Sequence, residues 1–187
     1  MTEQSQSNGS ASMEGYPTME ERQALLDLLS SSGEKLLSAL SLHAQHPQKT
    51  PSESGAWSPA QIAEHVMLTD AALLNAVKKA LALPVREDWQ AATLGKGDLL
   101  RSVATVTTKV EASAYLCPAA NLDLIATIAR YKQHLQELRS FLEGQTGPMH
   151  AHLLPHNFFG DLSAYQWGQF LGYHTLRHVG QMEDWSK

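Results

Sequence analysis

Residues 162–183 read LSAYQWGQFLGYHTLRHVGQME, and this stretch carries both a helix start and two histidines on one helical face. Ser163 and Gln166 have the spacing of a capping box, in which each side chain bonds the other residue's backbone N–H. Leu162 and Trp167 flank them as a hydrophobic staple, so a helix should run from here to about Glu183. Its inward stripe recurs at helical spacing and consists of Trp167, Phe170, Leu171, His174, His178 and Met182.

An earlier stretch repeats this start signal. Ser58-Pro59-Ala60-Gln61 supplies a capping box with a proline at the first helical position, and Trp57 and Ile62 form the matching staple. The pattern predicts a helix over 59–83, roughly 36 Å long. His65 lies in the apolar stripe of this helix, three residues beyond Ile62.

Two more helices are predicted over 19–44 and 121–143, with Thr18 and Asn121 as their N-caps. Ser31-Ser32-Gly33 should bend or break the first of them, since glycine in a helix interior costs about 1 kcal/mol relative to alanine.

The segments between these helices are harder to assign. Residues 98–112 have helical spacing but many β-branched side chains, so a strand is also compatible, and 145–162 are predicted to be irregular. The predicted fold is all-α: an up-down four-helix bundle with an extra short helix or irregular segment between its second and third long helices.

Composition bounds the class of protein. The 187 residues suit one domain over 18–187, preceded by a polar stretch, 1–17, that is predicted to be a disordered tail. Fourteen Lys+Arg against 19 Asp+Glu give a net charge of −5, which excludes a basic nucleic-acid footprint. No apolar run is long enough to span a membrane. The single cysteine, Cys117, is expected to be a small packed residue and fits a cytoplasmic protein without disulfides.

Three of the nine histidines point into one bundle interior from two helices: His65, His174 and His178. Neutral imidazoles there would leave polar nitrogens buried, and cationic ones would repel one another. A divalent cation removes both problems because it takes one nitrogen from each ring. The alternative is that these are ordinary hydrogen-bonded histidines. A metalloprotease is disfavoured because Thr175, not glutamate, follows His174.

The remaining histidines have weaker assignments. His43 and His46 are expected at the surface, and His134 should face solvent. A second group either forms a polar rim around the site or supplies an extra ligand or substrate contact: His150, His152 and His156. Gln181, one turn beyond His178, either contacts bound water or substrate or makes an ordinary interhelical hydrogen bond. No catalytic residue is assigned.

These motifs together resemble the DinB/YfiT-like superfamily of bacterial four-helix-bundle metalloproteins. The resemblance rests on Trp57-Ser58-Pro59, Ala63-Glu64-His65, the stretch 156–163, Trp167, His174, His178 and Gln181. It implies a divalent metal, commonly nickel or zinc, held by His65, His174 and His178 with water completing the shell. It also implies a homodimer, and thiol-dependent transferase or isomerase activity where members have an assigned reaction.

Three neutral imidazoles would leave the charge of the ion uncompensated and a coordination position open. Such a site lowers the pKa of bound water and deprotonates a coordinating thiol. The sequence therefore suggests a metal-dependent enzyme that transfers a low-molecular-weight thiol to an electrophilic substrate. A metal-dependent hydrolase and a non-catalytic metal-binding, structural or interaction domain remain as alternatives.

Overall fold

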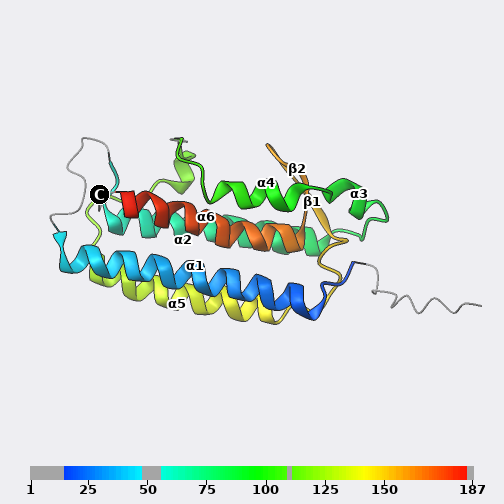
Figure 1. Cartoon of the computed structure of the whole chain (residues 1–187), viewed down its shortest axis with the longest axis horizontal. Helices are drawn as coiled ribbons and strands as arrows, with labels where there is room; N and C mark the ends of the chain where they lie inside the picture. Colours follow the sequence, from blue (N-terminus) through cyan, green and yellow to red (C-terminus); the bar gives the residue numbers. More distant parts are fainter. Residues whose placement is uncertain (1–14, 48–55, 109–110, 185–187) are drawn as a thin grey trace, which may run out of the picture.

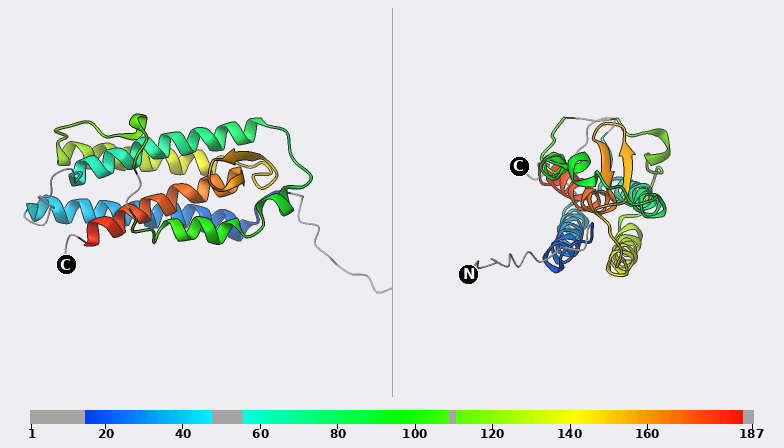
Figure 2. Two further views of the ribbon diagram at one scale, coloured as in Figure 1. Left: turned by 90° about the horizontal axis from the view of Figure 1, so that it is seen from above. Right: turned by 90° about the vertical axis from the view of Figure 1, so that its right-hand side faces the viewer.

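The computed structural model describes residues 15–47, 56–108 and 111–184, and four long helices dominate it. The end-on view in Figure 2 places these helices at the corners of a square, which confirms the predicted all-α bundle. Helix α1 packs on α5 and α6, and α2 packs on the same two helices. The bounds of the four helices are α1 (Met19–Gln45), α2 (Pro59–Ala82), α5 (Leu124–Glu143) and α6 (Ala164–Asp184).

Helices α1, α2 and α6 each begin at a capping box, which Thr18 and Glu21 form in α1 and the two predicted pairs form in α2 and α6. In the last of them, Gln166 N–H donates to Ser163 Oγ at 3.1 Å, and Ser163 N–H donates to Gln166 Oε1 at 3.1 Å. The cap predicted for α5 is wrong: Asp123, not Asn121, accepts from the backbone N–H of Ala126 at 2.7 Å. Asn121 instead occupies the left-handed region with φ 56°, so it belongs to the turn before the helix.

The predicted break in α1 is also wrong, because the helix continues through Ser31-Ser32-Gly33. Gly33 lies where α1 meets α5, and a Cβ at this position would stand 2.5 Å from Leu135 Cδ2. The glycine therefore permits close helix packing, which outweighs its low helix propensity.

The chain between α2 and α5 returns along the bundle, so that α5 runs in the same direction as α2 (Figure 1). It forms α3 (Trp89–Thr93), α4 (Lys96–Val103) and the 3₁₀ turn η2 (Ala114–Leu116). The helix predicted over 98–112 is thus wrong beyond Val103, after which the β-branched stretch leaves the helix. Helix α4 lies along α6, outside the square of long helices (Figure 2), and buries Leu100.

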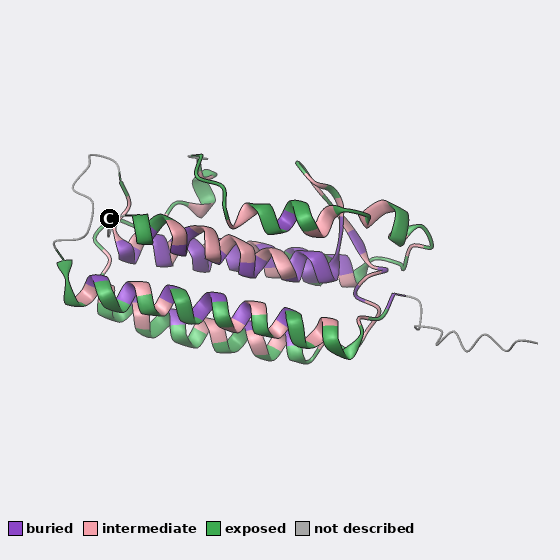
Figure 3. Ribbon diagram, viewed as in Figure 1, coloured by how far each residue is buried: buried purple, intermediate pink, exposed green. Residues whose placement is uncertain are grey.

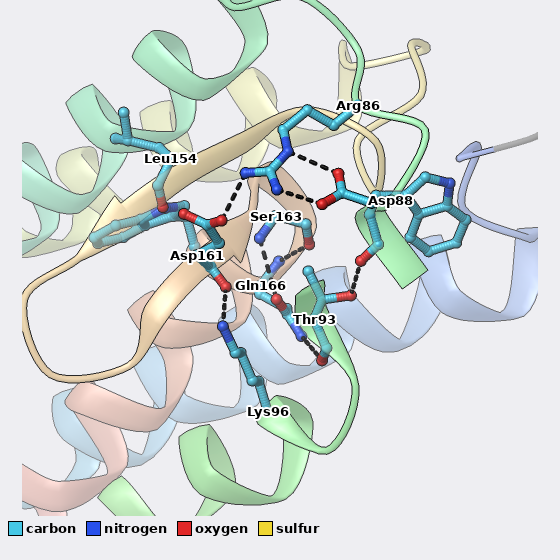
Figure 4. Close-up of polar contacts among 10 residues, drawn as sticks. Arg86, Asp88, Thr93, Lys96, Leu154, Asp161, Ser163 and Gln166 are labelled. Atoms are coloured by element: carbon cyan, nitrogen blue, oxygen red, sulfur yellow. Dashed lines mark hydrogen bonds and ion pairs between the residues drawn. The ribbon is translucent and has the colours of Figure 1, made fainter. Parts of the chain in front are cut away.

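Residues 145–162 are not irregular throughout, since they contain an antiparallel hairpin of β1 (Leu153–His156) and β2 (Gly160–Ser163). Asp161 on this hairpin anchors the α2–α4 connection: its carboxylate meets Arg86 Nη1 at 2.6 Å, and its carbonyl accepts from Lys96 Nζ at 2.6 Å (Figure 4). The strands escaped prediction because four residues each are too few to establish a period.

Buried side chains line the inward faces of all four helices (Figure 3) and form two clusters. One lies at the hairpin end and includes Leu25, Val77, Leu142, Trp167 and Leu171; the other lies at the opposite end and includes Leu36, Leu40, Ile62, Tyr131 and Met182. In the described part of the chain, no helix is long and apolar enough to cross a membrane.

The predicted N-terminal tail, 1–17, falls mostly on residues 1–14, which lie outside the described residues. Its last part is packed on the domain: Gly15 is buried, and its carbonyl accepts from the backbone N–H of His150 at 2.9 Å.

Candidate metal centre

Three histidines from α2 and α6 meet inside the bundle, at the end away from the hairpin. One ring nitrogen of each lies within 4.8 Å of the others, and the three ring centroids are 4.7 to 5.4 Å apart. These are His65, His174 and His178, the three that the sequence analysis selected. The i, i+4 spacing on α6 places two of the rings one turn apart, edge to face at an interplanar angle of 69°, and the capped start of α2 places the third opposite them.

Hydrogen bonds set the orientation of two of the rings. His65 Nδ1–H donates to the carbonyl of Leu116 at 2.9 Å, and His178 Nδ1–H donates to Gln181 Oε1 at 3.0 Å. Since a neutral imidazole carries one proton, Nε2 of each ring keeps a free lone pair. This is the arrangement that metal-binding histidines use, with one nitrogen facing the ion and the other bonded outward.

One of the distances between the rings fits a divalent ion. His174 Nε2 and His178 Nε2 are 3.3 Å apart, and two ligands bound tetrahedrally to zinc at 2.0–2.1 Å would be about 3.3–3.4 Å apart. His174 Nδ1 is buried without a hydrogen-bond partner. The two Nε2 atoms lie within hydrogen-bond distance of each other, so the atom that lacks a protein partner is His174 Nδ1 and not either of these two.

The electrostatic surroundings keep the rings neutral. Burial lowers the pKa of His178 to about 3, and it lowers the pKa of His65 and, more strongly, that of His174 below the usual value. The neighbouring histidines add to the lowering for His174 and His178. Neutral imidazole is the form that binds metal, so the cluster needs no deprotonation near pH 7.

The family comparison agrees with this geometry. The sequence model of the DinB superfamily matches residues 18–182. The chain belongs to the DinB superfamily. Searches of curated proteins and of solved structures found no match.

A covering segment, here defined as residues 104–108 and 111–119, runs beside the histidines of this DinB-superfamily chain. Three hydrogen bonds hold it: Arg177 Nη2–H to Thr108 O at 2.9 Å, Gln61 Nε2–H to Ala119 O at 3.3 Å, and the His65–Leu116 bond. The Trp57 ring lies 4.8 Å from the His65 ring. His174 is partly exposed, whereas His65 and His178 are buried.

Cys117 lies in the covering segment but is exposed, so the prediction of a packed cysteine is wrong. Its proline neighbour ends the 3₁₀ turn at the surface, and its thiol is not part of the histidine group.

The three histidines of the hairpin region make other contacts. His150 stacks on Trp89 and lies 3.2 Å from Glu21 Oε2, and His152 Nδ1–H donates to Leu83 O at 2.7 Å. His156 Nδ1 accepts from the N–H of Phe158 at 3.0 Å. None of them joins the group of described residues that could hold an ion.

Two other surface predictions are wrong, while His46 is exposed as predicted. His43 is buried, because the last turn of α1 still packs inward. His134 is 18% exposed, and its Nε2 lies 3.1 Å from the buried carboxylate of Asp70.

Sequence reasoning missed Asp70 and Arg177. Burial raises the pKa of Asp70. Asp70 lies next to Thr69 among the inward positions of α2, and this position in the apolar stripe is the signal from which its burial could have been predicted. Arg177 stands directly before His178, and no spacing rule singles it out.

Proposed function

We propose that the chain binds one divalent metal ion, nickel or zinc, through His65, His174 and His178 and uses it to transfer a low-molecular-weight thiol to an electrophilic substrate. The observation that carries the proposal is the inward group of three neutral imidazoles, two of whose Nε2 atoms are 3.3 Å apart. Membership of the DinB superfamily supports it.

The number of ligands favours an open site. Structural zinc sites have four protein ligands, whereas the group that the described residues form has three. When bound, the ion would lower the pKa of a thiol or a water molecule in the open position.

The chain's own residues hold and enclose the site. Gln181 and the Leu116 carbonyl fix two of the rings, while Trp57 covers His65. No carboxylate belongs to the histidine group of described residues, so we assign no protein general base. Hydrolysis and a purely structural role are the competing functions, and the likeness to thiol-dependent members favours thiol transfer over both.

The test is a screen of the chain loaded with one equivalent of nickel or zinc. Glutathione-, bacillithiol- and mycothiol-type thiols are each offered with electrophilic acceptors, and loss of free thiol is followed together with product mass. We expect turnover with one thiol class in the wild type and none in His174→Ala. His152→Ala, at the hairpin end, is the matched control and should retain turnover.

Metal content, measured by mass spectrometry on the same samples, separates the two halves of the proposal. Full metal in His174→Ala would refute the ligand assignment. One bound ion in the wild type with no turnover of any thiol would refute the transferase and favour a structural role or, if esters or amides are cleaved, a hydrolase.

We also propose that the chain forms a homodimer, as the family resemblance implies. Sedimentation should then give about twice the chain mass of 20.5 kDa, and a monomer at micromolar concentration would contradict this.

A further inference from the structure

Arg177 stands on α6 between the two histidines of that helix and has no acidic partner among the described residues. By contrast, Arg86, Arg130 and Arg139 each meet a carboxylate at 2.6 to 2.9 Å. The only hydrogen bond that the described residues accept from Arg177 runs from Nη2 to the carbonyl of Thr108 at 2.9 Å. A guanidinium has five N–H donors in a planar fork, so most of this one remains available.

The guanidinium is bonded to the covering segment, which runs beside the histidines, and is partly shielded from water. Burial lowers the pKa of Arg177, and its side chain is of intermediate exposure. Burial is also the main cause of the lowered pKa values of the three histidines, and the charge of Arg177 contributes to each of them. A permanent positive charge thus lies on the same helix as two of the three histidines and acts on all three.

This placement creates a charge imbalance. Three neutral imidazoles, a divalent ion and Arg177 sum to three positive charges, and the histidine group contains no carboxylate. A bound thiolate would compensate one of these charges. A thiolate that also carried a carboxylate would compensate two, and the planar fork of arginine matches a carboxylate in a bidentate pair.

Resting on the proposed function, we propose that Arg177 binds a carboxylate of the thiol substrate and so selects anionic thiols over neutral ones. The thiol sulfur then lies at the open side of the histidine cluster, next to the partly exposed His174, and the carboxylate lies against the free N–H groups of Arg177. Arg177 is a specificity-determining residue and takes no part in the bond changes.

The competing role is structural, since Arg177 also holds the covering segment through Thr108. Loss of that anchor would weaken binding of every ligand to a similar degree. A carboxylate-binding role instead affects only ligands that carry the carboxylate. Two thiols of the same shape therefore separate the roles.

The experiment is calorimetric titration of the zinc-loaded full chain with 3-mercaptopropionate and with its neutral amide, 3-mercaptopropionamide. Charged hydrogen bonds of this kind should make the wild type prefer the carboxylate by about tenfold or more. Arg177→Gln should bind both thiols alike, and Arg177→Lys should keep part of the preference. Arg101→Gln, an exposed arginine on α4, should behave as the wild type.

The outcomes separate the two proposals. An unchanged preference in Arg177→Gln, or equal binding of the two thiols to the wild type, overturns the role of Arg177 and leaves thiol activation standing. Binding of neither thiol to the zinc-loaded wild type overturns both. Zinc content and helical circular dichroism are recorded for each variant. If Arg177→Gln does not fold, Arg177→Lys replaces it: a reduced preference for the carboxylate supports the inference, and an undiminished preference overturns it.

Discussion

At its first turn α6 pairs its buried polar atoms with other protein atoms, whereas about three turns later it leaves one histidine nitrogen buried without a partner. At the hairpin end, Ser163 and Gln166 bond each other reciprocally, and Trp167 Nε1–H donates to Leu154 O at 3.2 Å. At the histidine end, His174 Nδ1 is buried without a partner, and its Nε2 faces that of His178 at 3.3 Å.

The difference shows which end of the bundle is stabilised by protein contacts alone. A buried polar atom that lacks a partner costs stability, and the three neutral imidazoles form a set of ligand nitrogens that binding of an ion would stabilise. The hairpin end gains from caps and from the contacts that hold Asp161 (Figure 4) and requires no ligand. Four predictions test this contrast, beginning with the largest effect.

Removal of metal should destabilise the protein through its histidine end. An ion that binds only the folded chain, at a free concentration about 1,000 times its Kd, raises the free energy of unfolding by about 4 kcal/mol. Urea unfolding with zinc and with chelator measures the difference, and hydrogen exchange should place it in the second half of α6 and the first half of α2. Zinc should stabilise His156→Ala as much as the wild type; an equal stabilisation of His178→Ala would contradict the contrast.

The hydrogen bond from His178 to Gln181 should tune metal affinity. Removing the acceptor that fixes a ligand ring typically weakens metal binding about 10–100-fold, so Gln181→Leu should bind zinc more weakly by this factor. Competition with a chromophoric chelator gives the affinity. The matched control is Gln166→Leu, which breaks a capping box at the other end of α6 and should leave zinc affinity unchanged.

The histidine cluster also shows what sequence patterns can predict. Periodicity and capping boxes predict the bundle, three helix starts and the inward faces that carry His65 and the α6 histidines, because each follows from residues close together on one helix. The partner of His65 is instead far away in the chain, at Leu116 in the covering segment. No local rule predicts which carbonyl a distant loop presents.

The same reasoning explains the incorrect predictions. Gly33 is predicted to interrupt its helix because the sequence does not show that Leu135 packs against it. Similarly, His134 is assigned to solvent only when the buried carboxylate of Asp70 on another helix is not considered. In both cases a tertiary contact overrides a local preference.

Acid should destabilise the metal-free protein through the same cluster. Unfolded His178 takes up a proton near pH 6.5, whereas burial holds its pKa in the folded chain at about 3. The free energy of unfolding is therefore unaffected by this group above pH 6.5 and decreases as the pH falls toward 3. The decrease should reach about 2 kcal/mol at pH 5. Urea unfolding at pH 7 and pH 5, compared with His178→Gln, isolates this contribution. Parallel pH dependence in the two proteins would contradict it.

The smallest effect concerns the two matching capping boxes at opposite ends of the bundle. Ser163→Ala and Ser58→Ala each remove a side-chain acceptor from a helix start, and each should cost about 1 kcal/mol in the free energy of unfolding. Their effect on zinc should differ. Ser163 precedes His174 by three turns of helix, so zinc affinity should be unchanged in Ser163→Ala. Ser58 lies two turns before His65, next to Trp57, and fraying there should weaken zinc binding measurably. Equal zinc affinities in the two variants would mean that the start of α2 is held by its packing against α6 rather than by its cap.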